Sequence, residues 1–224
     1  MPELVVPDPS ERDDLGAFVA RAVRLEQTAA VRLRQRTNGD ADRIDLWVST
    51  PFDALVTRSA TGTVTPADIT VAGSDLLAAL AIVGGERMDP GVARDLLWRS
   101  ALPPSHGWTV VDDVPASVLG ELTDRGVALA REHAGPQGTP PASLLDQTVL
   151  TVKGAGYDIS VPLRCLFALS GMGFVATASA GPAVSEPGAA DDPVRISATD
   201  SWLRIDARFG AVVRRRHALL PLLV

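Results

Sequence analysis

The sequence predicts an α+β protein made of two βαβββ-like halves, each an antiparallel meander with helices, joined by a helical middle. Two segments near opposite ends of the chain read alike: Val-Arg-Leu, Arg-Ile-Asp and Phe-Asp-Ala-Leu-Val-Thr-Arg in residues 31–58, and Val-Arg-Ile, Arg-Ile-Asp and Phe-Gly-Ala-Val-Val-Arg-Arg in residues 194–215. A hydrophobic-x-Val-Pro tetrad stands upstream of each segment, at 4–7 and 159–162, and a helical pattern follows each tetrad. Such self-similarity is typical of internal duplication.

The repeat leaves two interpretations open. Either the chain contains a true duplication, or it contains two unrelated antiparallel sheets whose strands share common residue types. The matches keep their order, but the loops between them differ in length. Strand order in the structure separates the two interpretations, because unrelated sheets have no reason to share it.

Composition restricts the class of protein. Hydrophobic residues make up 46% and charged residues 21% of 224 residues, which is typical of a folded globular chain. The net charge of −6 argues against broad affinity for nucleic acid or anionic lipid. A single cysteine, Cys165, excludes an intrachain disulfide and a multi-cysteine zinc site. With neither a signal-peptide pattern nor an apolar run of about 20 residues, we expect a cytoplasmic protein without a membrane partner.

The first half begins with a helix and continues with strands. Ser10 as the cap, followed by acidic residues, predicts a helix over about 10–26. Alternation then predicts a strand that carries Arg32, Arg34 and Arg36 on one face, a turn at 37–40, a second strand through residues 44–48 and a third at about 52–57.

The middle of the chain is predicted to be helical. Helices are expected from Ser74 to Gly84, after Asp89-Pro90, and from about 113 to 133, with a short strand at 108–111 before the last of them. Residues 134–142, rich in Gly and Pro, are the candidate linker. The predicted domains are therefore 1–135, an N-terminal α+β domain with a helical extension, and 136–224.

The second half returns to strands. Residues 148–152 and 157–161 read as a β-hairpin, followed by a helix from Pro162 to about Gly171 and a strand at 174–178. Residues 179–193 contain few large apolar groups and are predicted to be a flexible insertion. The second meander follows, and the apolar tail 218–224 either packs within the chain or a homodimer, or serves as a docking segment.

One group of residues points to catalysis. His106 precedes Asp112 and Asp113 and could serve acid–base chemistry on a small molecule if the three side chains converge in a pocket. The competing interpretation is an exposed loop histidine. Cys165 lies in an apolar helical pattern, which is typical of a buried structural cysteine. No spacing typical of a metal site or a cofactor loop is present, so we expect no catalytic residue, no metal and no cofactor.

Arginines are the better candidates for binding. The binding candidates are Arg32, Arg34, Arg36, Arg214, Arg215 and Arg216. Clustered arginines can contact phosphates or an acidic partner. The competing interpretation is a solvated sheet face in which they pair with Asp45 or Asp206 across strands.

Two resemblances add to this reading. The segments Leu145-Asp146 with 149–152, 161–164 and Met172 to Phe174 resemble a family of conserved actinobacterial proteins of unknown function, which implies no activity. Residues 3–83, with strand, helix, meander and then Gly62-Thr63-Val64, are similar to one subdomain of a DNA sliding clamp. That resemblance implies duplicated βαβββ units in a protein that can be acidic overall, with basic helices facing DNA.

Taken together, the sequence favours a non-catalytic binding or scaffolding protein with a protein partner or a second copy of itself. One alternative is a clamp-like protein associated with nucleic acid. The other is a small-molecule enzyme that uses His106 with Asp112 or Asp113.

Overall fold

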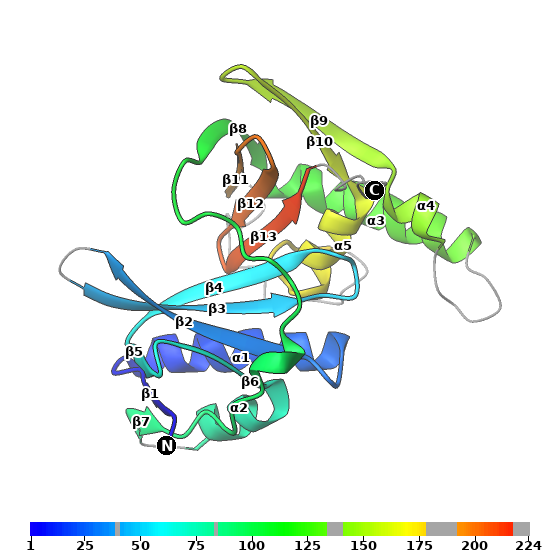
Figure 1. The fold of residues 1–224 in the computed structure, drawn as a ribbon. Coiled ribbons are helices and arrows are strands. Elements are labelled where there is room, and N and C mark those ends of the chain that lie inside the picture. The colour runs from blue at the N-terminus through cyan, green and yellow to red at the C-terminus, as the bar shows by residue number, and fades with distance from the viewer. Residues whose placement is uncertain (39–40, 83–84, 134–140, 178–191, 217–224) are drawn as a thin grey trace, which may run out of the picture. The chain divides into compact units, whose positions relative to one another are not determined.

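The computed structural model describes residues 1–38, 41–82, 85–133, 141–177 and 192–216, which form two compact units, Met1–Leu102 and Pro103–Val224 (Figure 1). These units divide at 102/103, and the predicted domain boundary at 135/136 stays a prediction. The helix that ends near residue 132 contacts a helix of the second unit. The predicted linker at 134–142 and the predicted insertion at 179–193 lie almost wholly outside the described residues, as does the tail 218–224.

The first unit is a four-stranded antiparallel sheet with two helices on one face (Figure 1). Its strand order is β6-β2-β3-β4, and a small second sheet has the order β5-β1-β7. Its elements are β1 (Glu3–Val5), α1 (Pro9–Leu25), β2 (Ala30–Asn38), β3 (Ala41–Ser49), β4 (Leu55–Thr61), β5 (Thr63–Thr65), β6 (Asp68–Ala72), α2 (Gly73–Leu80), β7 (Arg87–Met88) and the 3₁₀ turn η1 (Asp95–Leu97).

Helix α1 forms close to its predicted position, but its N-cap lies two residues earlier than predicted. Asp8, not Ser10, is the N-cap, because its carboxylate accepts a hydrogen bond from the Ser10 N–H at 2.8 Å. Leu15, Phe18 and Val19 recur at helical spacing and are buried against the sheet. The strands supply the other side of this core with alternate residues, among them Leu33, Ile44 and Leu46.

The second unit repeats this plan with a sheet of strand order β13-β12-β11-β8 and the helices α3 and α5 (Figure 1). The hairpin of β9 and β10 forms a separate two-stranded sheet, as its sequence predicts. The elements are β8 (Thr109–Pro115), α3 (Ala116–Glu132), α4 (Ala142–Leu145), β9 (Thr148–Gly154), β10 (Tyr157–Pro162), α5 (Leu163–Gly171), β11 (Pro193–Ala198), β12 (Trp202–Ala207) and β13 (Gly210–Arg215).

The two halves share one order of elements. The first reads β1-α1-β2-β3-β4 and the second reads β10-α5-β11-β12-β13, and both end in an antiparallel meander. A further strand that leads into a helix flanks each meander on the same side: β6 beside β2, and β8 beside β11. The extra strand and helix follow the meander in the first unit and precede it in the second. This shared order favours duplication, and common ancestry of the two segments stays a prediction.

The strand register refines the repeat seen in the sequence. Ile44 and Ile205 are buried at the centres of β3 and β12 and pair with Gln35 and Ile196, respectively. By strand register, Arg195 is therefore equivalent to Arg34. The sequence repeat instead matches Arg195 with Arg32, two residues earlier. A shift of two residues keeps every side chain on its own face. The longer β2–β3 hairpin accounts for the shift.

Two predicted elements are wrong. Residues 89–94 are not helical and end in the short turn η1, and residues 174–177 are not a strand. The first segment is instead held against the edge strand β6, where the Arg94 N–H donates to the Thr70 carbonyl at 2.7 Å. That tertiary contact outweighs the local helical pattern.

Helix α3 lies within the predicted span. The spacing of Val118, Leu122 and Leu129 predicts that they face inward, but they are not among its buried residues. Val118 is 38% exposed, and the inward face consists of Leu119 and the small residues Gly120, Thr123, Gly126 and Ala130. A Cβ atom on Gly120 would collide with the Ala176 carbonyl, and one on Gly126 would collide with the Leu163 side chain. The glycines therefore let α3 pack close to its neighbours.

Across the described residues, no helix is long and apolar enough to cross a membrane.

Candidate functional site

The sheet of the first unit carries an arginine-bearing face opposite its helices. We call this surface the arginine face; it consists of Arg32, Arg34 and Arg36 on β2, Arg43 and Asp45 on β3, and Asp68 on β6. Strand alternation brings these side chains together, because β2 pairs with β3 on one side and with β6 on the other.

Arg32 anchors one end of the arginine face. Its guanidinium donates two hydrogen bonds of 2.7 Å to the carboxylate of Asp68, a forked arrangement that fixes both groups. The hydrogen bonds that Arg32 donates to Asp68 raise the pKa of Arg32 above its ordinary value. The guanidinium carbon also lies 5.8 Å from the centroid of the Trp98 ring, within range of a cation–π contact. Arg32 is therefore a well-partnered side chain.

Positive charge increases toward the β2–β3 turn. Arg34 shares Asp68 with Arg32, at an Nε–Oδ2 distance of 3.2 Å. Arg36 lies 3.5 Å from Asp45 and faces Arg43 directly across the strands. This face thus carries four arginines and two carboxylates, and three of the arginines share the two carboxylates. The predicted cross-strand pairing with Asp45 is present, and it leaves an excess of positive charge.

The structure separates the second predicted cluster instead of gathering it. Successive residues of a strand point to opposite faces, so Arg214 and Arg215 diverge. Arg214 lies 3.6 Å from Asp146, which also pairs with the buried Arg164 at 2.7 Å. Arg215 lies over the Trp202 ring at 4.7 Å. Arg214 and Arg215 thus contact different groups, and a binding role for them stays a prediction.

Arg216 is held on the side of the β9–β10 hairpin. It lies over the Tyr157 ring at 5.4 Å and donates to the Thr199 carbonyl at 3.0 Å. Together with Arg204 over Trp108, these contacts make a set of arginine–aromatic pairs in the second unit that the sequence did not indicate. Contacts of this kind hold long side chains against the surface.

The predicted acid–base site is not assembled. His106 is exposed, and its Nδ1 lies 3.0 Å from the Ser105 hydroxyl. Asp113 pairs with Arg195 at 3.1 Å, and Asp112 accepts a hydrogen bond from the Asp113 N–H. No hydrogen bond or ion pair joins His106 to either aspartate among the described residues. Cys165, as predicted, is buried in α5.

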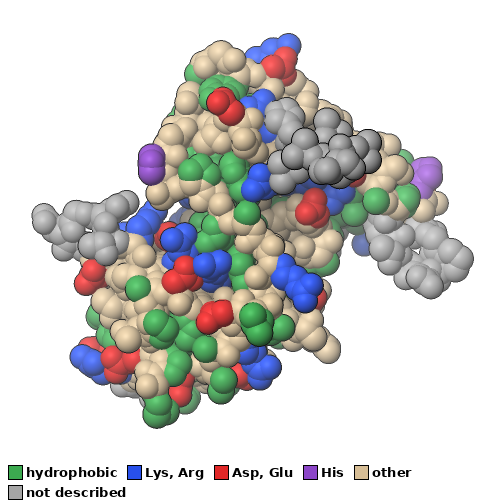
Figure 2. All heavy atoms as spheres, viewed as in Figure 1, with side chains coloured by type: hydrophobic (Ala, Val, Ile, Leu, Met, Phe, Trp, Pro, Cys, Tyr) green, Lys and Arg blue, Asp and Glu red, His purple; other side chains and the backbone are tan. Residues whose placement is uncertain are grey.

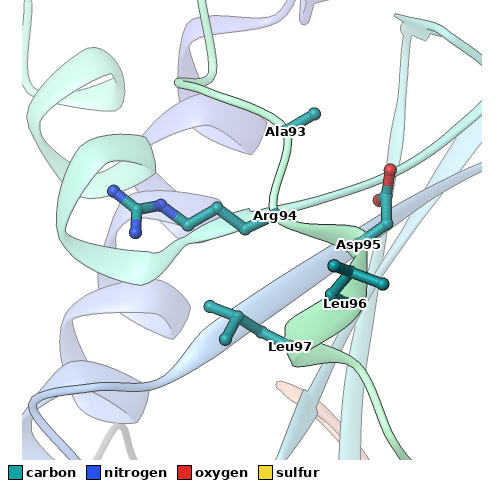
Figure 3. Close-up of a pocket in the computed structure, with 5 residues that line it drawn as sticks. All are labelled: Ala93, Arg94, Asp95, Leu96 and Leu97. Carbon is teal, nitrogen blue, oxygen red and sulfur yellow. The ribbon is translucent and has the colours of Figure 1, made fainter.

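A shallow hollow of about 520 Å³ lies along the segment that covers β6, lined by Ala93, Arg94, Asp95, Leu96 and Leu97 (Figure 3). Arg94 and Asp95 point in opposite directions in this view, so they do not act on one group. Asp95 is already engaged, because it accepts a hydrogen bond of 2.7 Å from the Thr70 N–H. The hollow lacks the converging polar groups that an active site needs.

Apolar side chains are exposed along the same part of the chain. Leu96 is 93% exposed, and Ile82, Val92 and Leu97 are each more than half exposed.

Elsewhere, basic and acidic side chains lie next to one another on the visible surface (Figure 2). Within the described ranges, no group of three or more His, Cys, Asp or Glu residues is placed to hold a metal ion.

Sequence reasoning missed Arg43 as a member of the arginine face. The signal was present, because Arg43 and Asp45 stand two residues apart and therefore share a face. The identity of its cross-strand neighbour was not accessible, because register depends on the length of the β2–β3 turn.

Sequence comparison identifies two known domains. The model of a domain of unknown function, DUF8185, matches residues 103–219, and that of another domain of unknown function, DUF8010, matches residues 1–100. None of the curated proteins matches the chain.

Structure comparison identifies sliding clamps. A DNA polymerase III subunit beta sliding clamp from Bartonella birtlesii has a TM-score of 0.52 and 14% identity, over 99% of this chain and 66% of that one. The DNA polymerase sliding clamp from Caulobacter crescentus gives 0.55 and 12%, over 98% and 67%. The clamp from Bacillus subtilis gives 0.54 and 10%, over 99% and 66%. The chain thus has a clamp-like fold and spans about two thirds of the length of these clamp chains.

Proposed function

The chain belongs to the family defined by the domain of unknown function DUF8185, and from its fold we propose that it is a non-catalytic, clamp-like protein that binds other copies of itself. The observation that carries the proposal is the likeness to sliding clamps along 98–100% of the chain. Fold alone does not assign function, so the surfaces of this chain must support it.

The exposed apolar residues favour a protein partner. Four large apolar side chains are exposed to solvent: Ile82, Val92, Leu96 and Leu97. Burial of such side chains in a complex is favourable. Soluble proteins that associate do so most often with copies of themselves. The scattered exposed groups of His106, Asp112 and Asp113 give no competing support for an enzyme.

The charges of the helices argue against the kind of DNA contact that the clamp resemblance implies. That resemblance implies basic helices, but α1 carries three arginines and three acidic residues. Helix α3 carries two arginines against three acidic residues. Neither helix offers the excess of positive charge that binding to a polyphosphate backbone requires.

Sedimentation equilibrium of the full chain over a hundredfold range of concentration tests the proposal. We expect a mass that rises with concentration above the 23.5 kDa of a single chain. Leu96→Asp places a charge on an apolar surface residue without disturbing the core, and should weaken the association. Val118→Asp, on a partly exposed residue of α3, is the matched control.

A nucleic-acid-associated clamp is the second candidate, and the excess arginines of the arginine face favour it. An electrophoretic mobility shift of duplex DNA at low and rising salt tests it. Binding at low salt that weakens steeply with salt supports this candidate. No shift at low salt eliminates it.

A further inference from the structure

Two arginines stand directly opposite each other near the β2–β3 turn. Arg36 and Arg43 are cross-strand partners in the register of the sheet. Their Cβ atoms are therefore about 5 Å apart, a separation at which like charges destabilise a strand pair. A pair of this kind needs negative charge nearby to offset the repulsion.

The neighbouring carboxylates do not supply enough of it. Arg36 Nε lies 3.5 Å from Asp45, and within the described part of the chain this buried nitrogen has no hydrogen-bond partner. Asp45 also accepts a hydrogen bond from the Ser59 hydroxyl. Arg43 takes part in no ion pair among the described residues.

Asp68, the other carboxylate of the arginine face, already interacts with other arginines of β2. It accepts two hydrogen bonds from Arg32 and also lies 3.2 Å from Arg34. Arg34 stays 47% exposed on its side-chain surface, so its guanidinium retains donors that face water. Arg34, Arg36 and Arg43 thus form a group of three guanidinium groups that have fewer carboxylate partners than charges among the residues that the structure describes.

We propose that Arg34, Arg36 and Arg43 form a binding site for a phosphate group. A doubly charged phosphate offsets both members of the opposed pair, whereas a carboxylate offsets only one. Its oxygens also match the forked donors of guanidinium groups. The ligand is free phosphate or a phosphomonoester, since both carry this charge.

Thermal unfolding and calorimetric titration of the full chain test the site. In a phosphate-free buffer at fixed ionic strength, inorganic phosphate and phenyl phosphate should each raise the Tm, and chloride should not. Arg43→Gln should weaken phosphate binding by about tenfold or more. In the absence of phosphate, it should leave the Tm unchanged or higher, because it removes a like-charge repulsion.

Arg87→Gln is the matched control. Arg87 is a 70% exposed arginine of the same unit that pairs with Glu3, and its removal should leave the response to phosphate intact. A response to phenyl phosphate alone assigns the site to phosphomonoesters, and a response to both ligands assigns it to the phosphate group itself. No response of the native chain, or an equal response from Arg43→Gln, overturns the proposal. Binding of a single-stranded oligonucleotide without binding of either phosphate also overturns it, because a phosphodiester carries only one charge per phosphate.

Discussion

At the scale of single residues, burial decides which ion pairs matter. Asp146 and Asp158 each form an ion pair of 2.7 Å, but the partner of Asp146 is Arg164, whose side chain is 9% exposed, and the partner of Asp158 is the exposed Lys153. A buried guanidinium that loses a carboxylate bears the cost of its desolvation. An exposed ammonium is simply solvated by water.

We therefore expect Asp146→Ala to lower the free energy of unfolding by about 1–3 kcal/mol. Asp158→Ala should leave the unfolding midpoint unchanged within error. Chemical denaturation of both variants checks the difference. Equal effects would show that burial of Arg164 does not control the strength of its ion pair.

At the scale of elements, close packing of α3 depends on its glycines. Gly120→Ala places a methyl group against the Ala176 carbonyl, which is backbone and cannot rotate away. We expect a loss of about 1–3 kcal/mol in the free energy of unfolding. Gly16→Ala is the matched control in α1, where nothing lies within 4 Å of the added Cβ. It should raise stability by up to about 1 kcal/mol, because alanine favours helix. A neutral Gly120→Ala would contradict the close approach.

The segment that covers β6 gives a second prediction at this scale. Asp95→Ala leaves the Thr70 N–H without its acceptor, and a lost hydrogen bond of this kind costs about 1–3 kcal/mol. The uncovered strand edge should also increase aggregation, measured by light scattering during unfolding. Asp95→Asn keeps a carbonyl oxygen at the same place and should restore most of the loss. If Asp95→Asn is as damaging as Asp95→Ala, charge and not the strand-edge contact is responsible.

The same elements show what the sequence could predict. Helix α1, both meanders and the β9–β10 hairpin follow from periodicity, because their buried faces repeat every 3.6 or 2 residues. The segment 89–97 could not be predicted, since its conformation is set by bonds to Thr70, which lies far away in the sequence. The buried face of α3 was misplaced because most of the residues that face its neighbours are small. For the arginine face, alternation predicted Arg32, Arg34 and Arg36, whereas the place of Arg43 required the register.

At the scale of the whole molecule, the chain consists of two like halves that divide at 102/103. Each has its own buried core, so each should fold by itself. A protease site inserted between Leu102 and Pro103 should yield two fragments that both keep cooperative unfolding by circular dichroism. Loss of structure in the first fragment alone would place the domain boundary further along, near the predicted 135/136.

The central claim concerns assembly: we propose, from a clamp-like fold, helices without an excess of positive charge and exposed apolar side chains, that the protein acts by binding copies of itself. Sedimentation equilibrium tests this most directly. The claim predicts a mass that rises above 23.5 kDa with concentration and a weaker association for Leu96→Asp. A mass of 23.5 kDa at every concentration, with Leu96→Asp indistinguishable from the native chain, would contradict it.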